Sequence, residues 1–191
     1  MIGKIQDELR ESIDVKRAAL PLAEKVALAS QYIIQTISQG GTVFFCGNGG
    51  SAADAQHMAA ELLGRFERNR KALPAMALTT NSSTITALAN DFGYENIFIR
   101  QLQGLADSKD TVVGISTSGT SANVVKALEW ARENGLKTIG MTGQGGGKLA
   151  DIVSVLLAAP SLHTPRIQEL HITWGHIICG LVEEALCSHE E

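Results

Sequence analysis

The chain has 191 residues, of which 45% are hydrophobic and 19% charged, and its formal net charge at pH 7 is −4. This composition is typical of a globular domain large enough to bury a core, and the scattered basic residues give no support for a nucleic-acid partner. The three cysteines are odd in number and lack CxxC spacing, which argues against a disulfide framework and against a cysteine-built zinc site. The charged N-terminus lacks the apolar core of a signal peptide, and no apolar stretch could span a membrane, so we expect a soluble cytoplasmic protein.

The first 40 residues predict two helices, because apolar residues recur at helical spacing from Ile2 to about Ser38. Pro21 interrupts the pattern and is compatible with the first turn of the second helix, where its missing N–H costs nothing. Gly40 and Gly41 are expected to end that helix.

From residue 41 onward, short apolar strands alternate with helices. The predicted strands are 42–46, 74–80, 111–116, 137–142 and 152–159, and the predicted helices are 51–66, 83–90, 96–106, 121–134 and 165–187. This alternation favours a parallel sheet covered by helices on both faces. We therefore predict a three-layer α/β sandwich with a mostly parallel five-stranded sheet. It would form a single domain in which an N-terminal helical segment, 1–40, is added to an α/β core, 41–191.

The stretch VFFCGNGGSAADAQH, residues 43–57, contains a glycine turn after the first predicted strand. Gly47, Gly49 and Ala52 fit the G-x-G-x-x-A pattern of dinucleotide sites. Such a site also needs an acidic residue at the end of the second strand to bind a ribose, and that strand ends without a carboxylate. A nicotinamide site is therefore disfavoured, while a purely structural turn stays open for this stretch taken alone.

A second turn, GISTSGTSAN, residues 114–123, follows the third predicted strand and opens a helix. Five hydroxyl side chains surround Gly119: Ser116, Thr117, Ser118, Thr120 and Ser121. Hydroxyl groups and free backbone N–H groups at a helix N-terminus can bind a phosphate monoester, whereas a helix cap needs only one hydroxyl. The cluster favours a phosphate site. A third glycine cluster, 142–150, lacks such a hydroxyl cluster and is interpreted as a plain connecting loop.

Titratable side chains recur on two of the predicted helices. His57 and Glu61 lie four residues apart on one helix face, and Arg65 continues the same line. Such a pair can bind a divalent metal or place a base beside an acid, although a solvated polar face is commoner. On the last helix, Gln168, Glu169 and His176 lie on one face or its edges, and His171 is interpreted as a hydrogen-bonded core residue.

Five motifs occur in the order and at the spacing of a known family: CGNGGSAADAQHMAAELLGRF, NDFG, GISTSGTSANVVKAL, GMTGQGGG and PRIQELHITWGHII. Over almost the whole chain, the sequence resembles the sugar isomerase (SIS) domain family and, within it, the bacterial phosphoheptose isomerases. The resemblance implies conversion of D-sedoheptulose 7-phosphate into D-glycero-D-manno-heptose 7-phosphate, the first step toward ADP- or GDP-activated heptoses. It also implies a homotetramer with sites shared between subunits, and one zinc ion per subunit.

The resemblance assigns roles to individual residues. Glu61 matches the catalytic base, which would move a proton from C1 to C2 through an enediol, and His176 matches the acid that shuttles protons among the oxygens. The matched metal ligands are His57, Glu61, Gln168 and His176. The matched substrate contacts are Asn48, Gly49, Gly50, Ser51, Glu61, Arg65, Asn90, Asp91, Ser116, Thr117, Ser118, Ser121 and Gln168. Pro165 departs from the family, since some members carry an aspartate there.

Two other functions stay open. Some relatives are non-catalytic SIS scaffolds that bind the replication initiator protein, and others isomerise or sense a different sugar phosphate. The presence of both Glu61 and His176 favours the enzyme over the scaffold.

Overall fold

The computed structural model describes residues 1–187 and contains one five-stranded sheet of order β2-β1-β3-β4-β5. The strands are β1 (Val43–Gly47), β2 (Ala75–Ala77), β3 (Thr111–Ile115), β4 (Lys137–Thr142) and β5 (Val155–Ala158). All neighbouring strands pair in parallel, with Val43 opposite Ala75 and Thr111. The predicted parallel five-stranded sheet is therefore confirmed.

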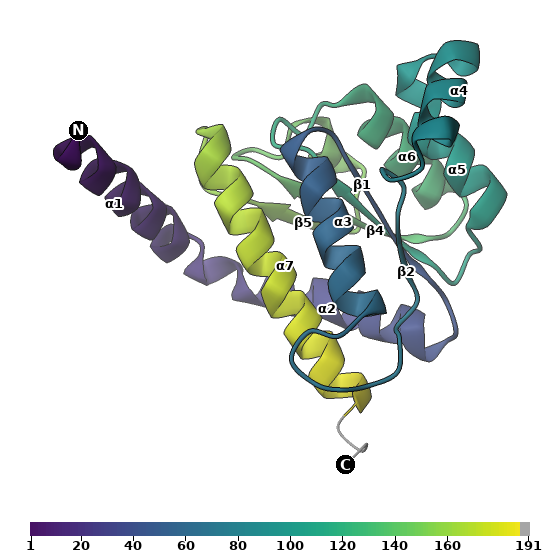
Figure 1. Ribbon diagram of the computed structural model, residues 1–191, viewed down its shortest axis with the longest axis horizontal. Coiled ribbons are helices and arrows are strands. Elements are labelled where there is room, and N and C mark those ends of the chain that lie inside the picture. The colour runs from purple at the N-terminus through teal and green to yellow at the C-terminus, as the bar shows by residue number, and fades with distance from the viewer. Residues whose placement is uncertain (188–191) are drawn as a thin grey trace.

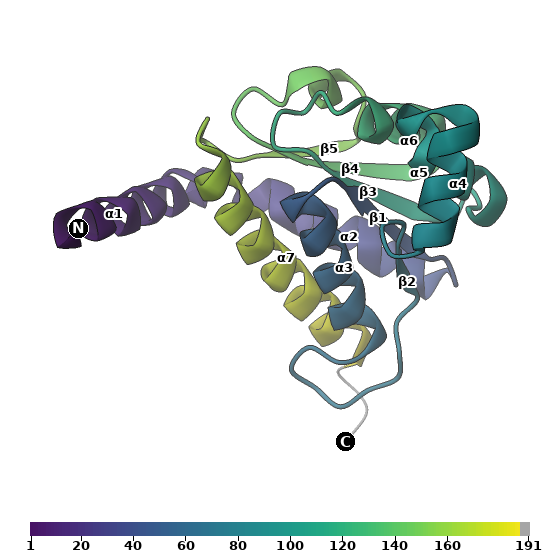
Figure 2. The same cartoon turned by 45° about the horizontal axis from the view of Figure 1, so that its top comes forward.

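Helices cover both faces of this sheet, as Figures 1 and 2 show. One layer contains α2 (Ala23–Ser38), α3 (Gly50–Leu63) and α7 (Thr164–Cys187), and the other contains α4 (Ser82–Phe92), α5 (Ile97–Leu105) and α6 (Ala122–Glu133). The remaining helix, α1 (Ile2–Ala18), precedes them, and short 3-10 turns lie at Leu20–Leu22, Tyr94–Asn96 and Gly147–Asp151. The three-layer architecture with added N-terminal helices is as predicted.

Alternation along the strands divides the core into two parts. Phe45 and Val113 pack with the layer of α2, α3 and α7, whereas Phe44, Cys46 and Val112 pack with the layer of α5 and α6. Both faces of every central strand are thus covered, which explains why these strands are nearly continuous apolar runs.

Some predicted boundaries were wrong. The helix expected to reach residue 66 ends at Leu63, because the backbone N–H groups from Phe66 to Arg68 donate to the Glu183 carboxylate of α7 instead of continuing the helix. The edge strand β2 pairs only over three residues, and β5 begins three residues later than predicted. Pro21 lies in the 3-10 turn before α2 rather than in the first turn of α2 itself. Gly40, with φ of 72°, follows the end of α2 as expected.

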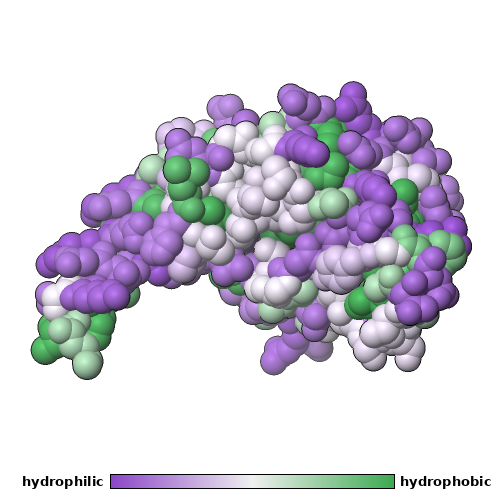
Figure 3. Space-filling view, turned by 90° about the horizontal axis from the view of Figure 1, so that it is seen from above, coloured by the Kyte–Doolittle hydropathy of each residue, from purple (hydrophilic) through white to green (hydrophobic). Residues whose placement is uncertain are grey.

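Helix α1 extends away from the body as an arm (Figure 1) and buries none of its residues. Ile2, Ile5, Leu9 and Ile13 are exposed and recur at helical spacing, so they form an apolar stripe that we call the α1 stripe. The space-filling view shows apolar surface at the tip of this arm (Figure 3). Among the described residues, no helix combines the length and the apolar character needed to cross a bilayer.

Candidate active site

The glycine turn after β1 and the turn after β3 lie next to each other, because their strands are neighbours in the sheet. The amides of Asn48 and Asn123 exchange two hydrogen bonds, of 2.9 and 2.8 Å, across the gap between the two turns. The hydroxyl of Tyr94 donates to the side-chain oxygen of Asn48 at 3.0 Å. Asn123 and Tyr94 had no role in the sequence analysis, and only their contacts with Asn48 identify them.

The turn after β3, residues 116–121, is called the hydroxyl loop below. Ser121 is the N-cap residue of α6, but its side chain makes no capping hydrogen bond. Its hydroxyl instead bonds with that of Ser116 at 2.8 Å, and the hydroxyl of Thr120 donates to Ser118 Oγ at 2.9 Å. Simple capping therefore does not explain the cluster, and the hydroxyl groups face one another at the start of a helix, where an anion is favoured.

The third glycine cluster does more than connect two strands. A Cβ atom on Gly119 would collide with the carbonyl oxygen of Gly146, and one on Gly147 would collide with that of Ser118. Gly143 also donates its backbone N–H to the Thr117 carbonyl at 2.9 Å. The prediction of a plain connecting loop was therefore incomplete, because these glycines allow two backbones to approach closely and hold the hydroxyl loop in shape.

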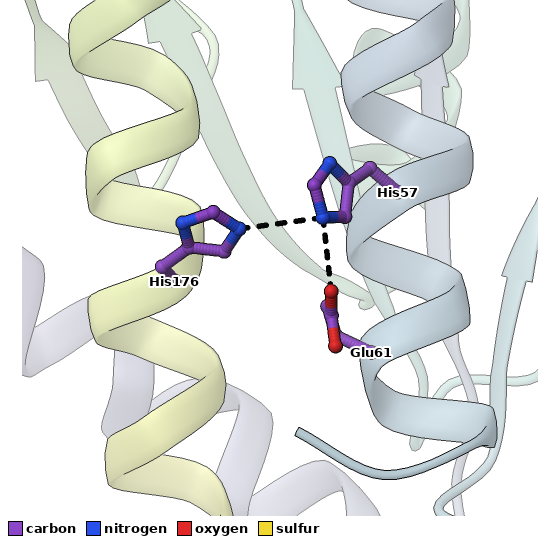
Figure 4. A group of neighbouring side chains, drawn as sticks. All are labelled: His57, Glu61 and His176. Carbon is purple, nitrogen blue, oxygen red and sulfur yellow. Dashed lines mark hydrogen bonds and ion pairs between the residues drawn. The ribbon is translucent and has the colours of Figure 1, made fainter. Parts of the chain in front are cut away.

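His57, Glu61 and His176 converge between two helices that run side by side, α3 and α7 (Figure 4). The first two residues share one face of α3, and His57 Nε2 lies 2.9 Å from Glu61 Oε1. His176 reaches across from α7, so that its Nε2 atom lies 3.3 Å from His57 Nε2. We call these three residues the His–Glu–His cluster.

The donor set of this cluster fits a divalent cation. One atom from each of the three side chains can be chosen so that all lie within 4.8 Å of one another. A single proton on His57 Nε2 can satisfy Glu61 or His176 but not both, which leaves an unshared electron pair facing the centre. Two imidazoles and one carboxylate are also a ligand set that zinc accepts.

Two further side chains surround the cluster. The ring of Phe66 stacks on that of His176 with centroids 5.6 Å apart and an angle of 24° between planes. Asp54 lies one turn before His57 on α3, and its Oδ2 atom is buried without a hydrogen-bond partner in the described part of the chain. Burial raises the pKa of the Asp54 carboxyl, and the nearby His57 opposes this. Sequence analysis missed both residues, although the helical spacing of Asp54 from His57 was a usable signal.

The structure separates the other matched residues from this cluster. The side-chain amide of Gln168 packs against Gly50, at the start of α3, seven residues before His57. Arg65 is exposed and lies beyond the end of α3, so it does not continue the line of His57 and Glu61 as expected.

The remaining matched residues lie at the end of α4 and at the glycine turn before α3. Asn90 and Asp91 are exposed at the end of α4, where they bond to each other at 2.8 Å. Ser51 is buried in the first turn of α3. Gly49, just before it, has a φ of 55°, a conformation that favours glycine.

His171 is a core residue, as predicted. It is fully buried, and its Nε2 lies 2.9 Å from the carbonyl oxygen of Thr142, so this nitrogen carries the proton. Its other ring nitrogen has no partner among the described residues, and burial lowers the pKa of the imidazole to about 4. Cys46 and Cys179 are likewise buried, and burial raises the pKa of each thiol to about 12, which makes them unreactive.

A second group of possible metal ligands, Glu8, Glu11 and His163, lies where α1 meets the start of α7. The guanidinium of Arg166 forms ion pairs with the carboxylates of this group, 3.1 Å from Glu8 and 3.7 Å from Glu11. It also donates a hydrogen bond to the Glu8 carbonyl oxygen. The positive charge of Arg166 disfavours a cation there. The group instead anchors the arm formed by α1.

Comparison with known proteins agrees with this fold. The family model of the SIS domain matches residues 8–143. The phosphoheptose isomerase of Rhodospirillum rubrum is 54% identical over 166 residues, which cover 87% of this chain and 88% of that protein. Solved phosphoheptose isomerases from Neisseria gonorrhoeae and Francisella tularensis are 41% and 35% identical, with TM-scores of 0.90 and 0.92. They cover 95% and 96% of this chain and 98% of their own.

The fold and its carboxyl-edge turns define a SIS domain. The chain belongs to the SIS domain family and, within it, to the phosphoheptose isomerases.

Proposed function

We propose that the chain interconverts D-sedoheptulose 7-phosphate and D-glycero-D-manno-heptose 7-phosphate in the cytoplasm, as the entry to nucleotide-activated heptoses. The observation that carries the proposal is the convergence of a carboxylate and two imidazoles in a chain about half identical to phosphoheptose isomerases. A non-catalytic scaffold has no need of such a cluster. The isomerase is therefore favoured over a protein that only binds the replication initiator.

The reaction moves a proton between neighbouring carbons and needs a base near the carbons and an acid near the oxygens. Glu61 removes a proton from C1 of the ketose and returns it to C2, so the intermediate is a cis-enediol. His176 transfers protons between the two oxygens. His57, 2.9 Å from the carboxylate, helps to orient it.

His57, Glu61 and His176 would hold one zinc ion, which would polarise the carbonyl oxygen and stabilise the enediolate when bound. The donor set supports this assignment, as described above. The amide of Gln168 lies against Gly50, away from the His–Glu–His cluster of its own chain. As the fourth ligand, Gln168 would therefore have to reach the cluster of another subunit.

The hydroxyl loop binds the phosphate of the substrate through Ser116, Thr117, Ser118 and Ser121, and fixing this end orients the reacting carbons. Asn48–Ser51, Arg65, Asn90 and Asp91 contact the sugar.

We also propose that the sites are shared between subunits of a homotetramer. At 1.5 Å per residue, His57 and Glu61 lie about 10 and 16 Å along α3 from Gly50, which is at the edge with the hydroxyl loop. A site that uses every matched residue is more compact when a second subunit supplies part of it. The exposed α1 stripe supports an assembly, since it buries no residue in its own chain.

The test is turnover of sedoheptulose 7-phosphate by the purified chain and by Glu61→Gln, each with and without a chelator. The variant should keep its fold and its affinity for substrate, while kcat falls at least ~100-fold because the general base is lost. Loss of activity on chelation would support the metal. No turnover by metal-replete wild type would contradict the proposal, and a pull-down with the initiator protein would then test the scaffold.

A further inference from the structure

The segment that follows α3, residues 64–74, contains no helix or strand. Two charged side chains hold it in place. It carries Phe66, whose ring stacks on His176. The position of this segment therefore affects both proposed catalytic residues. Glu61 lies in the helix turn just before the segment, and His176 lies against the Phe66 ring.

A buried ion pair joins the segment to α7. Arg70 Nε is 2.8 Å from Glu183 Oε1, and the two side chains are only 1% and 2% exposed. The Glu183 carboxylate also accepts the backbone N–H groups of Phe66 at 3.2 Å, Glu67 at 2.8 Å and Arg68 at 2.9 Å. Burial by itself would raise the pKa of this carboxyl, but the backbone hydrogen bonds and the charge of Arg70 together hold it below its usual range. Glu183 is therefore ionised and fully bonded.

Arg70 uses its other nitrogens on the end of α3. It donates to the carbonyl oxygens of Glu61 at 2.8 Å, Leu62 at 2.9 Å and Gly64 at 3.2 Å. The last carbonyl groups of a helix have no partner within the helix, and a positive charge there also favours the helix dipole. Arg70 thereby fixes the last turn of α3, including the backbone of Glu61.

Glu183 belongs to α7 and lies two turns after His176 on the same side of that helix. Between them, Gly180 lies beside the Phe66 ring, at a distance where a Cβ atom would make an ordinary contact of 3.4 Å. Phe66, His176 and Glu183 all line one hollow of about 410 Å³. One continuous set of contacts thus runs from the backbone of Glu61 through Arg70 and Glu183 to α7 and His176.

We propose that Arg70 and Glu183 are positioning residues that set the geometry between Glu61 on α3 and His176 on α7. This inference rests on the proposed function, in which these two residues transfer protons. We expect neither Arg70 nor Glu183 to touch the substrate, because both side chains are almost fully buried. They act by holding the last turn of α3 and the Phe66 ring against α7, so that the carboxylate and the imidazole meet at one place.

The main test is Glu183→Gln, which keeps the size of the side chain but removes its charge and turns an amide N–H₂ toward backbone N–H donors. We expect kcat to fall roughly 10- to 100-fold, because small misplacement of catalytic groups is costly, while KM stays within about twofold. Arg70→Lys, which keeps the charge but not the planar fork, should lower kcat in the same manner. Glu184→Gln is the matched control, since Glu184 is the exposed neighbour, and it should behave as wild type.

A second readout does not depend on turnover. The stacked ring of Phe66 shifts the proton resonances of the His176 imidazole, and Phe66→Leu shows where they lie without it. In folded Glu183→Gln or Arg70→Lys, these resonances should move toward their positions in Phe66→Leu. If the variants only lose stability, while kcat per folded molecule and the His176 resonances stay as in wild type, the proposal is overturned. If wild type itself has no turnover, the proposed function fails, and the resonances still decide whether the ion pair holds the Phe66–His176 stack.

Discussion

His171 should make this protein sensitive to mild acid, by an amount that follows from its burial. The imidazole is fully buried, it donates to the Thr142 carbonyl through one nitrogen, and its other nitrogen has no partner among the described residues. Burial lowers the pKa of His171 from 6.5 to about 4. Between these two values the unfolded chain binds a proton at this residue and the folded chain does not, so the folded state loses stability as pH falls.

The difference between the two pKa values corresponds to a total of about 3 kcal/mol, of which about 2 kcal/mol is lost between pH 7.5 and pH 5. Urea unfolding at these two pH values measures the loss directly. In His171→Gln, whose amide nitrogen can still donate to Thr142, the loss should be smaller than in wild type by about 2 kcal/mol. His163→Gln, which removes a histidine that is 46% exposed, is the control and should keep the wild-type loss to within about 0.5 kcal/mol. An equal loss in wild type and His171→Gln would refute the reasoning.

Three further predictions concern the hydroxyl loop and the arm. Ser116→Ala combined with Ser121→Ala should raise KM for the sugar phosphate about tenfold or more with little change in kcat, because hydrogen bonds to a charged phosphate are lost. An unchanged KM in steady-state assays would contradict the phosphate site. Gly119→Ala should lower the free energy of urea unfolding by at least about 1 kcal/mol, since the φ of Gly119 is 66° and a Cβ atom would meet the Gly146 carbonyl. Gly3→Ala is the control and should cause no such loss, because the space around Gly3 is open. If Gly119→Ala were as stable as wild type, the close packing would be contradicted. Leu9→Lys combined with Ile13→Lys should reduce the assembly size in light scattering with circular dichroism unchanged, and an unaltered mass would show that the α1 stripe is not an interface.

Most of the fold could be predicted because its signals are local. The strands read as short apolar runs and the helices as runs with helical spacing, and both kinds of pattern depend only on neighbours in the chain. The errors fell where a local preference competes with tertiary contacts. The helix expected to reach residue 66 stops at Leu63, and the residues beyond it follow the Arg70–Glu183 pair, whose partners are more than 110 positions apart.

Some features of the candidate site could likewise be predicted from local sequence patterns, and others depend on tertiary packing. The sequence by itself determined that His57 and Glu61 share a helix face and that hydroxyl groups cluster after the third strand, because helical spacing and strand order place them. Only the tertiary structure decided that His176 meets His57 across two helices, that Gln168 packs against Gly50, and that Arg65 leaves the line of the site. It also decided that Phe66 stacks on His176 and that Glu183 binds three backbone N–H groups. These contacts join segments that are distant in the chain, and the way in which α3, α7 and the segment between α3 and β2 pack against one another fixes them.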